Sequence, residues 1–481
     1  FIVSAPDGSP LERQQAGQAF VVLGSEDGPT SNGFQGLDFS SAITILGAEM
    51  GDKAGMSVSG AGDFNGDGFS DILVGVSFAT TENVADNHGE VFIIFGGKEM
   101  TGGKLIDLKE FNSSQGVRIT GLMNDMNFTG CSVTGVGNID GRHNPTTKIG
   151  YDDIMIGAWG VGNDNSGRAY IIYGNNTPLS IIDLQNLSFG EGTIIKGIGL
   201  NHKNLGSSVC GAGDVNGDGV PDLIVAADVH AENTPAEFAV FYLIYGPKYI
   251  KEQNTYSQFP LELDLGAPAP EGLEWVRLEG ISAHPIDNEH GGIGLAGVGD
   301  VNGDGFADFL IGAPAAEVNG IANTGQAYLV FGSPKGIGVN GSLNLNPLSL
   351  GDDANGDDNP DMILIQGQSG APTIGMDFRD AYFGYSVTGA GDVNSDGYCD
   401  FMIGAPGLNL QGVGPLAPDV QKGGGAFLVF GGPYLASDGG IINLFDAGAS
   451  RVAIIPGGLP GGNLGWSLSG AGFVDGDGIS D

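Results

Sequence analysis

The sequence predicts an all-β protein, a β-propeller built from repeated four-stranded blades. Two short patterns recur along the 481 residues, six times each, and no stretch has the period of a long amphipathic helix. Each repeat offers about four short segments rich in β-branched and aromatic residues, separated by turns rich in Gly and Asp. Four-stranded units repeated around a ring are the arrangement of propeller blades.

The first pattern is a Gly-rich strand that runs into an acidic loop and out into a second strand. Its clearest copy covers Phe383–Pro406 and reads FGYSVTGAGDVNSDGYCDFMIGAP. Counting from Asp392, side-chain oxygens stand at loop positions one, three, five and nine. Gly397 at position six permits a sharp bend, and the backbone carbonyl of Tyr398 at position seven would complete the set, as in other calcium loops.

Four copies of this loop are intact. Oxygen ligands without His or Cys favour Ca²⁺ over zinc, with Mg²⁺ or Mn²⁺ as alternatives. A solvated turn needs no carboxylates at fixed spacing, so the recurrence favours a metal site. The predicted ligands, counting the carbonyl at position seven, are Asp63, Asn65, Asp67, Phe69 and Asp71; Asp214, Asn216, Asp218, Val220 and Asp222; Asp300, Asn302, Asp304, Phe306 and Asp308; and Asp392, Asn394, Asp396, Tyr398 and Asp400.

Two further copies are degenerate, and their sites are expected to be weak or empty. One begins with Asn138 and Asp140 but has Arg142 where a ligand should stand, and the insertion HNPTTKIGY precedes Asp153. The other has Phe473 at position one and keeps Asp475, Asp477 and Asp481.

The second pattern is a strand that ends in an aromatic residue or Leu followed by Gly, as in VFIIFG, AYIIYG, FYLIYG, AYLVFG, AFLVFG and AFVVLG. With the acidic loops it divides residues 1–481, read as one domain, into six units. The predicted blades are 34–97, 105–174, 181–246, 261–332, 343–432, and 441–481 joined with 1–24. The last unit is split between the termini because FIVSAP at the start resembles the strand expected after Asp481. Seven blades remain an alternative if the sequence is part of a longer chain.

Composition excludes several classes of function. A net charge of −39 argues against nucleic acid and against an anionic membrane surface, since both attract clustered Lys and Arg. The sequence has no apolar run long enough for a transmembrane helix, so membrane insertion is not expected. Three Cys residues cannot form a disulfide framework.

The residues of both patterns resemble FG-GAP repeats, the units of the integrin α-subunit propeller and of many bacterial surface proteins. Phe383-Gly384 with Gly404-Ala405-Pro406 is the full signature, and Gly312-Ala313-Pro314 is a partial one. The resemblance implies that calcium is structural and lies at one face of the ring, with partners on the opposite face. That partner face would include the long connections Ser77–His88, Trp159–Ser166, Asp228–Glu237, Ala315–Thr324 and Leu408–Lys422.

The expected function is a calcium-binding module, extracellular or at the cell surface, that binds a protein or glycan ligand in adhesion or surface assembly. Calcium loops of extracellular modules have dissociation constants of about 10⁻⁴ to 10⁻³ M, too weak to fill in the cytosol. The six His residues do not recur in register and lie in no nucleophile motif, so an enzyme is not expected. The alternative is a carbohydrate-active or phospholipase-like hydrolase or lyase on a propeller scaffold. Self-assembly, or a place within a longer polypeptide, stays open.

Overall fold

The structure is a computed structural model of the whole chain. It describes residues 2–22, 42–80, 87–122, 126–144, 147–162, 166–177, 179–197, 204–227, 239–250, 255–256, 258–281, 294–338, 341–345, 360–367, 376–410, 422–435, 440–444, 451–457 and 461–470. Among these residues no helix is long and apolar enough to span a membrane.

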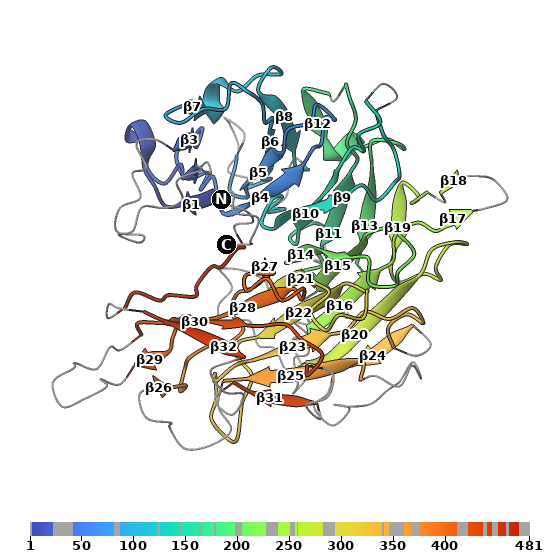
Figure 1. Cartoon of the computed structure of the whole chain (residues 1–481). Coiled ribbons are helices and arrows are strands. Elements are labelled where there is room, and N and C mark those ends of the chain that lie inside the picture. Colours follow the sequence, from blue (N-terminus) through green and yellow to red (C-terminus); the bar gives the residue numbers. More distant parts are fainter. Residues whose placement is uncertain are drawn as a thin grey trace.

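Six main β-sheets are arranged in a ring, which confirms the predicted all-β propeller (Figure 1). In five of them, four consecutive antiparallel strands run outward from the centre. The first strands are β4 (Ser57–Gly62), β9 (Val133–Gly137), β14 (Val209–Gly213), β21 (Leu295–Gly299) and β27 (Val387–Gly391). The second strands are β5 (Asp71–Val76), β10 (Asp153–Ala158), β15 (Asp222–Ala227), β22 (Asp308–Ala313) and β28 (Asp400–Ala405).

The third and fourth strands complete each of these sheets. The third strands are β6 (Glu90–Ile94), β11 (Arg168–Ile172), β16 (Ala239–Ile244), β23 (Gln326–Val330) and β30 (Gly425–Val429). The fourth strands are β8 (Gly116–Thr120), β13 (Gly192–Lys196), β20 (Trp275–Ile281), β25 (Met362–Gln366) and β32 (Val452–Pro456). The N-terminal sheet consists of β1 (Ile2–Ala5), β2 (Gln18–Val21), β3 (Ile43–Leu46) and a short outer strand.

Short parallel strands, not predicted from the sequence, cover the outer edges of five sheets. They are β7 (Leu105–Asp107), β12 (Ile181–Asp183), β19 (Glu262–Asp264), β24 (Ser342–Asn344) and β31 (Ile441–Asn443). In the chain, each lies between the third and fourth strands of one sheet. It pairs with the fourth strand of the sheet before it, as β7 does with β3. An uncovered edge would leave backbone N–H and C=O groups unpaired. The blades therefore have four or five strands.

The strand pairing shifts the predicted blade boundaries by one strand. The boundary at 34 groups Ile43–Leu46 with the acidic loop that follows it, whereas in the structure this strand pairs with Gln18–Val21. The same holds for Gly116–Thr120, which pairs with Glu90–Ile94 of the sheet before. A β-branched segment looks alike on either side of a blade boundary, so its pattern does not reveal its partner.

One blade is predicted to be split between the two termini, and the described residues include only part of it. The N–H of Gly470 donates to Thr388 Oγ1 at 3.3 Å, so the chain reaches β27 at this point. Residues 471–481, which would supply the first strand of the N-terminal sheet, lie outside the described residues. The split blade stays a prediction.

The GAP and FG elements of the repeat meet between neighbouring sheets. Gly312 lies in β22, and Gly384 precedes β27 of the next sheet. A Cβ at Gly312 would lie 1.9 Å from the carbonyl oxygen of Gly384. Only glycine permits this approach of two backbones. The motif is therefore a packing contact that sets the spacing of adjacent blades.

Apolar side chains on both faces of the sheets form the core between blades. Tyr170, Tyr242 and Tyr328 occupy equivalent places on the third strands β11, β16 and β23, and each is almost fully buried. The first strands surround a central cavity of about 400 Å³. Its lining includes the hydroxyl side chains Ser59, Ser132, Thr134, Ser208, Ser386 and Thr388.

Candidate metal loops

Each intact acidic loop connects the first and second strands of its sheet. Because the chain enters every such loop from the same end of a first strand, the loops lie at one end of the sheets. All twenty predicted ligands of the four intact loops fall within the described residues. Those of the last degenerate loop, Asp475, Asp477 and Asp481, lie outside them.

The side chains at positions one, three and five turn back onto the loop's own backbone. In the first loop, the N–H of Asp67 donates to Asp63 Oδ1 and Asn65 Oδ1, both at 2.9 Å. The N–H of Gly68 donates to Asp63 Oδ2 at 2.8 Å. The N–H of Phe69 donates to Asp67 Oδ1 at 2.9 Å. The loops that begin at Asp214, Asp300 and Asp392 repeat these hydrogen bonds.

The carboxylate at position nine has a second role that sequence reasoning missed. Asp71 is 1% exposed; its Oδ2 accepts from the N–H of Phe64 at 2.9 Å and its Oδ1 from Gly96 at 2.8 Å. Gly96 follows the third strand, so Asp71 ties the loop to the middle of its sheet. Asp222, Asp308 and Asp400 make the equivalent pairs of hydrogen bonds.

Charge accumulates around these anchors. The pKa of Asp71 is raised to about 7, chiefly by burial and also by the carboxylates of Asp67 and Asp63, against the lowering effect of its two backbone hydrogen bonds. Burial likewise raises the pKa of Asp222 to about 8, with added repulsion from Asp218 and Asp214. The pKa values of Asp308 and Asp400 shift in the same direction for the same reasons. A bound cation would offset this repulsion.

The donor set fits a hard divalent cation, since every side-chain ligand is a carboxylate or amide oxygen. The side chains are not arranged in a coordination geometry around a common point, however. In the part of the chain that the structure describes, no group of three or more His, Cys, Asp or Glu residues is placed to hold a metal ion. The oxygens are instead engaged with the loop's own N–H groups.

Neighbouring loops are joined to one another. At three places the residue at position eight donates its N–H to the carbonyl oxygen at position one of the preceding loop, as Cys399 does to Asp300 at 3.0 Å. The loop that begins at Asp214 has Pro221 at position eight, which has no N–H to donate. The aromatic ring at position seven packs over the glycine at position four of that loop. A Cβ at Gly303 would lie 2.4 Å from the Tyr398 ring, and one at Gly217 would lie 2.4 Å from the Phe306 ring. The signal in the sequence was the aromatic residue at position seven of three intact loops; the loop that begins at Asp214 has Val220 there.

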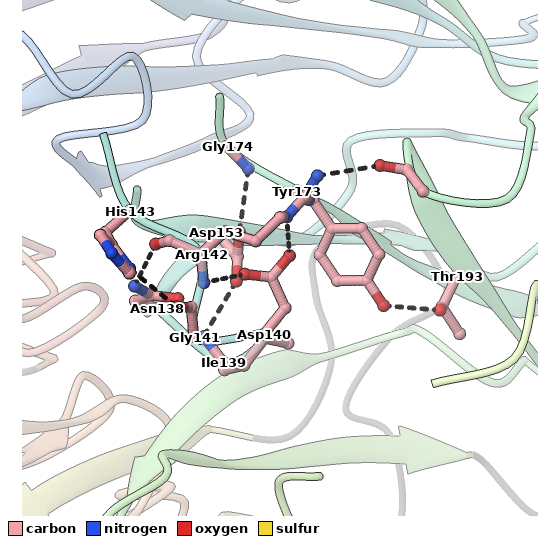
Figure 2. Close-up of polar contacts among 11 residues, drawn as sticks. Asn138, Ile139, Asp140, Gly141, Arg142, His143, Asp153, Tyr173, Gly174 and Thr193 are labelled. Atoms are coloured by element: carbon pink, nitrogen blue, oxygen red, sulfur yellow. Dashed lines mark hydrogen bonds and ion pairs between the residues drawn. The ribbon is translucent and has the colours of Figure 1, made fainter. Parts of the chain in front are cut away.

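The degenerate loop at 138–153 keeps the buried carboxylate at position nine but has a positively charged residue, Arg142, at position five (Figure 2). Asp153 is buried and accepts from the N–H groups of Ile139 and Gly174, both at 2.9 Å, as Asp71 does in its own loop. The structure brings Asn138, Asp140 and Asp153 into one loop, but the guanidinium of Arg142 lies against Asp140.

Comparison with known proteins agrees with the fold. The FG-GAP repeat model matches residues 54–94, 205–236 and 292–330. Integrin alpha-PS2 of Drosophila melanogaster is 29% identical over 200 residues, which is 40% of this chain and 11% of the relative. Integrin alpha-5 of Xenopus laevis is 27% identical over 236 residues, 47% of this chain and 18% of the relative.

An enzyme is also among the relatives. The human phosphatidylinositol-glycan-specific phospholipase D is 31% identical over 195 residues, 40% of this chain and 18% of the relative. The matched part is thus less than a fifth of the length of each of these three relatives. Together with the ring of six sheets, the comparisons identify the chain as a β-propeller that carries FG-GAP repeats and is similar to integrin alpha chains.

Proposed function

We propose that this chain is a calcium-stabilised binding module that works outside the cell or at its surface. The observation that carries the proposal is the fourfold repetition of one oxygen donor set at one end of the sheets, each copy with a buried carboxylate whose pKa is raised. The side chains at positions one, three, five and nine, with the carbonyl at seven, would hold the ion. Calcium would neutralise the carboxylates and hold each loop closed.

The proposed metal and the relatives both support a location outside the cell or at its surface. Loops of this kind fill at about 10⁻⁴ to 10⁻³ M calcium, a concentration found outside cells. The similarity to integrin alpha chains supports an extracellular or cell-surface protein that binds protein ligands. A glycan ligand is a further possibility within the same role.

The partner face is proposed at the end of the sheets opposite the acidic loops. The long connections named above follow the second strands, and those strands begin at the acidic loops, so the connections leave from the other end. Of these, residues 228–237 lie outside the described part of the chain, as do 81–86, 163–165 and 411–421.

An aromatic platform lies at this end, formed by Lys53, Phe78, Phe128 and Trp159. The rings of Phe128 and Trp159 stack with centroids 4.5 Å apart and an interplanar angle of 6°, and Phe78 meets Phe128 edge-on at 5.5 Å. Lys53 Nζ lies 5.1 Å from the Phe78 centroid. All three rings are partly exposed. Rigid aromatic surface with a nearby cation suits a protein or glycan ligand.

The experiment that tests the proposed metal is thermal unfolding of the chain in calcium and in EDTA, with calcium binding counted by titration calorimetry. We expect a higher melting temperature in calcium and about four ions or more per chain. Equal melting temperatures in the two buffers, with no heat of binding, would refute the proposal.

A lipid- or glycan-cleaving activity is the second candidate, favoured by the phospholipase D relatives. It predicts release of a glycan product from a phosphatidylinositol-glycan substrate by the purified chain. A rate no higher than the buffer blank would remove this candidate.

A further inference from the structure

We infer that Arg142 supplies, in the loop at 138–153, the positive charge that the intact loops would take from calcium, so that this loop holds its shape without a metal. The inference rests on the proposed calcium sites for its contrast. In this chain, a cationic side chain is part of a loop of the metal-binding type.

The loop at 138–153 shares one turn with the intact loops, between positions three and five. Arg142 stands at position five, and its N–H donates to Oδ1 of Asp140 at position three at 2.8 Å. In the first loop, the N–H of Asp67 makes the equivalent bond to Asn65 Oδ1 at 2.9 Å. Arg142 therefore occupies the place of a ligand at a turn that the intact loops share.

The guanidinium is held on three sides. Its Nε donates to Asp140 Oδ2, and its Nη1 donates to the carbonyl oxygen of Gly190 at 3.2 Å. The guanidinium carbon lies 5.0 Å from the centroid of the Tyr173 ring, whose hydroxyl pairs with Thr193 Oγ1 at 2.9 Å (Figure 2). The side chain of Asp140 is only 10% exposed, so its charge is largely removed from water. An ion pair in this setting is better shielded from salt than a surface pair.

The charge balance is the same as in a filled metal loop. An intact loop has three carboxylates, and one divalent cation leaves it with a net charge of −1. At its ligand positions, the loop at 138–153 has Asn138, the two carboxylates of Asp140 and Asp153, and the single charge of Arg142, which also leaves −1. Lys148 and Asp152, elsewhere in the loop, cancel each other. A calcium ion bound here as well would be repelled by the guanidinium of Arg142, which already contacts Asp140.

The backbone of Arg142 also closes the insertion that separates Asp140 from Asp153. Its carbonyl oxygen accepts from Asn138 Nδ2 at 2.6 Å and from the N–H of Tyr151 at 3.1 Å. These bonds bring the chain back to Tyr151 and Asp152, which then contact the first loop as positions seven and eight do elsewhere. The N–H of Asp152 donates to the carbonyl oxygen of Asp63 at 3.1 Å, and the Tyr151 ring lies over Gly66. The insertion thus preserves the contact between this loop and the first loop.

The test compares matched carboxylates and exchanges the charge of Arg142. Asp140→Asn should lower the melting temperature by about 2 °C or more, and by the same amount in calcium and in EDTA, because its partner is Arg142. Asp63→Asn, in an intact loop, should lower it more in calcium than in EDTA. Arg142→Asp should be less stable than the unmodified chain in EDTA, recover in calcium, and bind one more ion per chain by calorimetry. Arg142→Lys should keep the loop insensitive to calcium.

A larger loss for Asp140→Asn in calcium than in EDTA would show that this loop holds metal and would overturn the inference. So would an Arg142→Asp chain that folds, by circular dichroism, yet gains neither an ion nor a calcium response. If Arg142→Asp does not fold, Asp140→Asn still decides the question. Failure of the calcium proposal itself would appear separately, as equal losses for Asp63→Asn in the two buffers.

Discussion

The N–H of Ala307 donates a hydrogen bond to the carbonyl oxygen of Asp214 at 3.0 Å. Asp214 opens the acidic loop of one sheet, and Ala307 lies near the end of the loop in the next sheet. The Phe306 ring beside this bond covers Gly217 of the first loop. These two neighbouring loops are therefore linked, and the conformation of one constrains the other.

A methyl group added at Gly303 tests this link between neighbouring loops. Gly303→Ala places a Cβ 2.4 Å from the Tyr398 ring, and Gly305→Ala has open space at its Cβ. Both glycines have positive φ, 83° and 93°, so both variants bear backbone strain. We expect Gly303→Ala to lower the free energy of unfolding by about 1–3 kcal/mol more than Gly305→Ala, because only the first displaces a ring from the neighbouring loop. Equal losses in chemical unfolding would mean that the packing between loops contributes little.

Removal of the carboxylate at position one should reveal the metal. Asp→Ala at Asp63, Asp214, Asp300 or Asp392 removes a proposed ligand and the acceptor of at least two loop N–H groups. We expect melting temperature to fall far more in calcium than in EDTA, since only the calcium form loses a coordination bond. Differential scanning calorimetry in both buffers is the measurement, and similar losses in both would contradict a metal at these loops.

The contact between FG and GAP elements predicts a severe effect at Gly312. A Cβ there would lie 1.9 Å from the Gly384 carbonyl oxygen, and neither backbone can move without separating two sheets. Gly312→Ala should cost about 3 kcal/mol or more, in the range of the largest single substitutions. Gly60→Ala is the control, because a Cβ at Gly60 has open space. If urea unfolding gives the two variants the same midpoint, the close approach of the sheets is wrong.

A buried carboxylate away from the acidic loops predicts a pH dependence. Asp52 is 4% exposed, and burial raises its pKa to about 7; Glu90 and Glu49 raise it and His88 lowers it. Between pH 4 and 7 the unfolded chain has lost this proton and the folded chain still holds it, so the folded state binds more protons. Stability from this group therefore falls as pH rises through that window, by at most about 4 kcal/mol.

Asp52→Asn should remove this contribution and make the curve of unfolding free energy against pH less steep between pH 4 and 7. Glu12→Gln, a change at an exposed residue, is the control and should leave the curve unchanged. A curve for Asp52→Asn that parallels the unmodified chain would show that Asp52 titrates as an ordinary exposed carboxylate.

The aromatic platform predicts where a ligand touches the chain. Trp159→Ala removes the ring stacked on Phe128 and should weaken binding to a protein or glycan ligand at least about tenfold, as loss of an interface aromatic does. Phe189→Ala removes an aromatic side chain that is 64% exposed and lies outside the platform, and should leave binding unchanged. Binding can be measured on arrays of glycans and extracellular proteins; equal signals from both variants would place the ligand elsewhere.

Short-range patterns in the sequence determined the fold class and the loop donors. Alternating β-branched residues, Gly-rich turns and carboxylates at fixed spacing act within a few residues, so the strand–loop–strand unit and its repetition could be predicted. The turn from Asp63 to Phe69 illustrates this, because Asp63, Asn65 and Asp67 accept hydrogen bonds from N–H groups a few residues further along the same loop.

Contacts between distant segments were decided by the tertiary structure alone. Whether Ile43–Leu46 pairs forward or backward depends on the free edge of β2, and β7 finds its partner β3 across some sixty residues. The bond of Asp71 to Gly96, the ring of Tyr398 over Gly303 and the place of Arg142 beside Tyr173 each join segments that no local pattern relates. Such contacts are set by how the sheets pack around the ring, which is a property of the assembled fold.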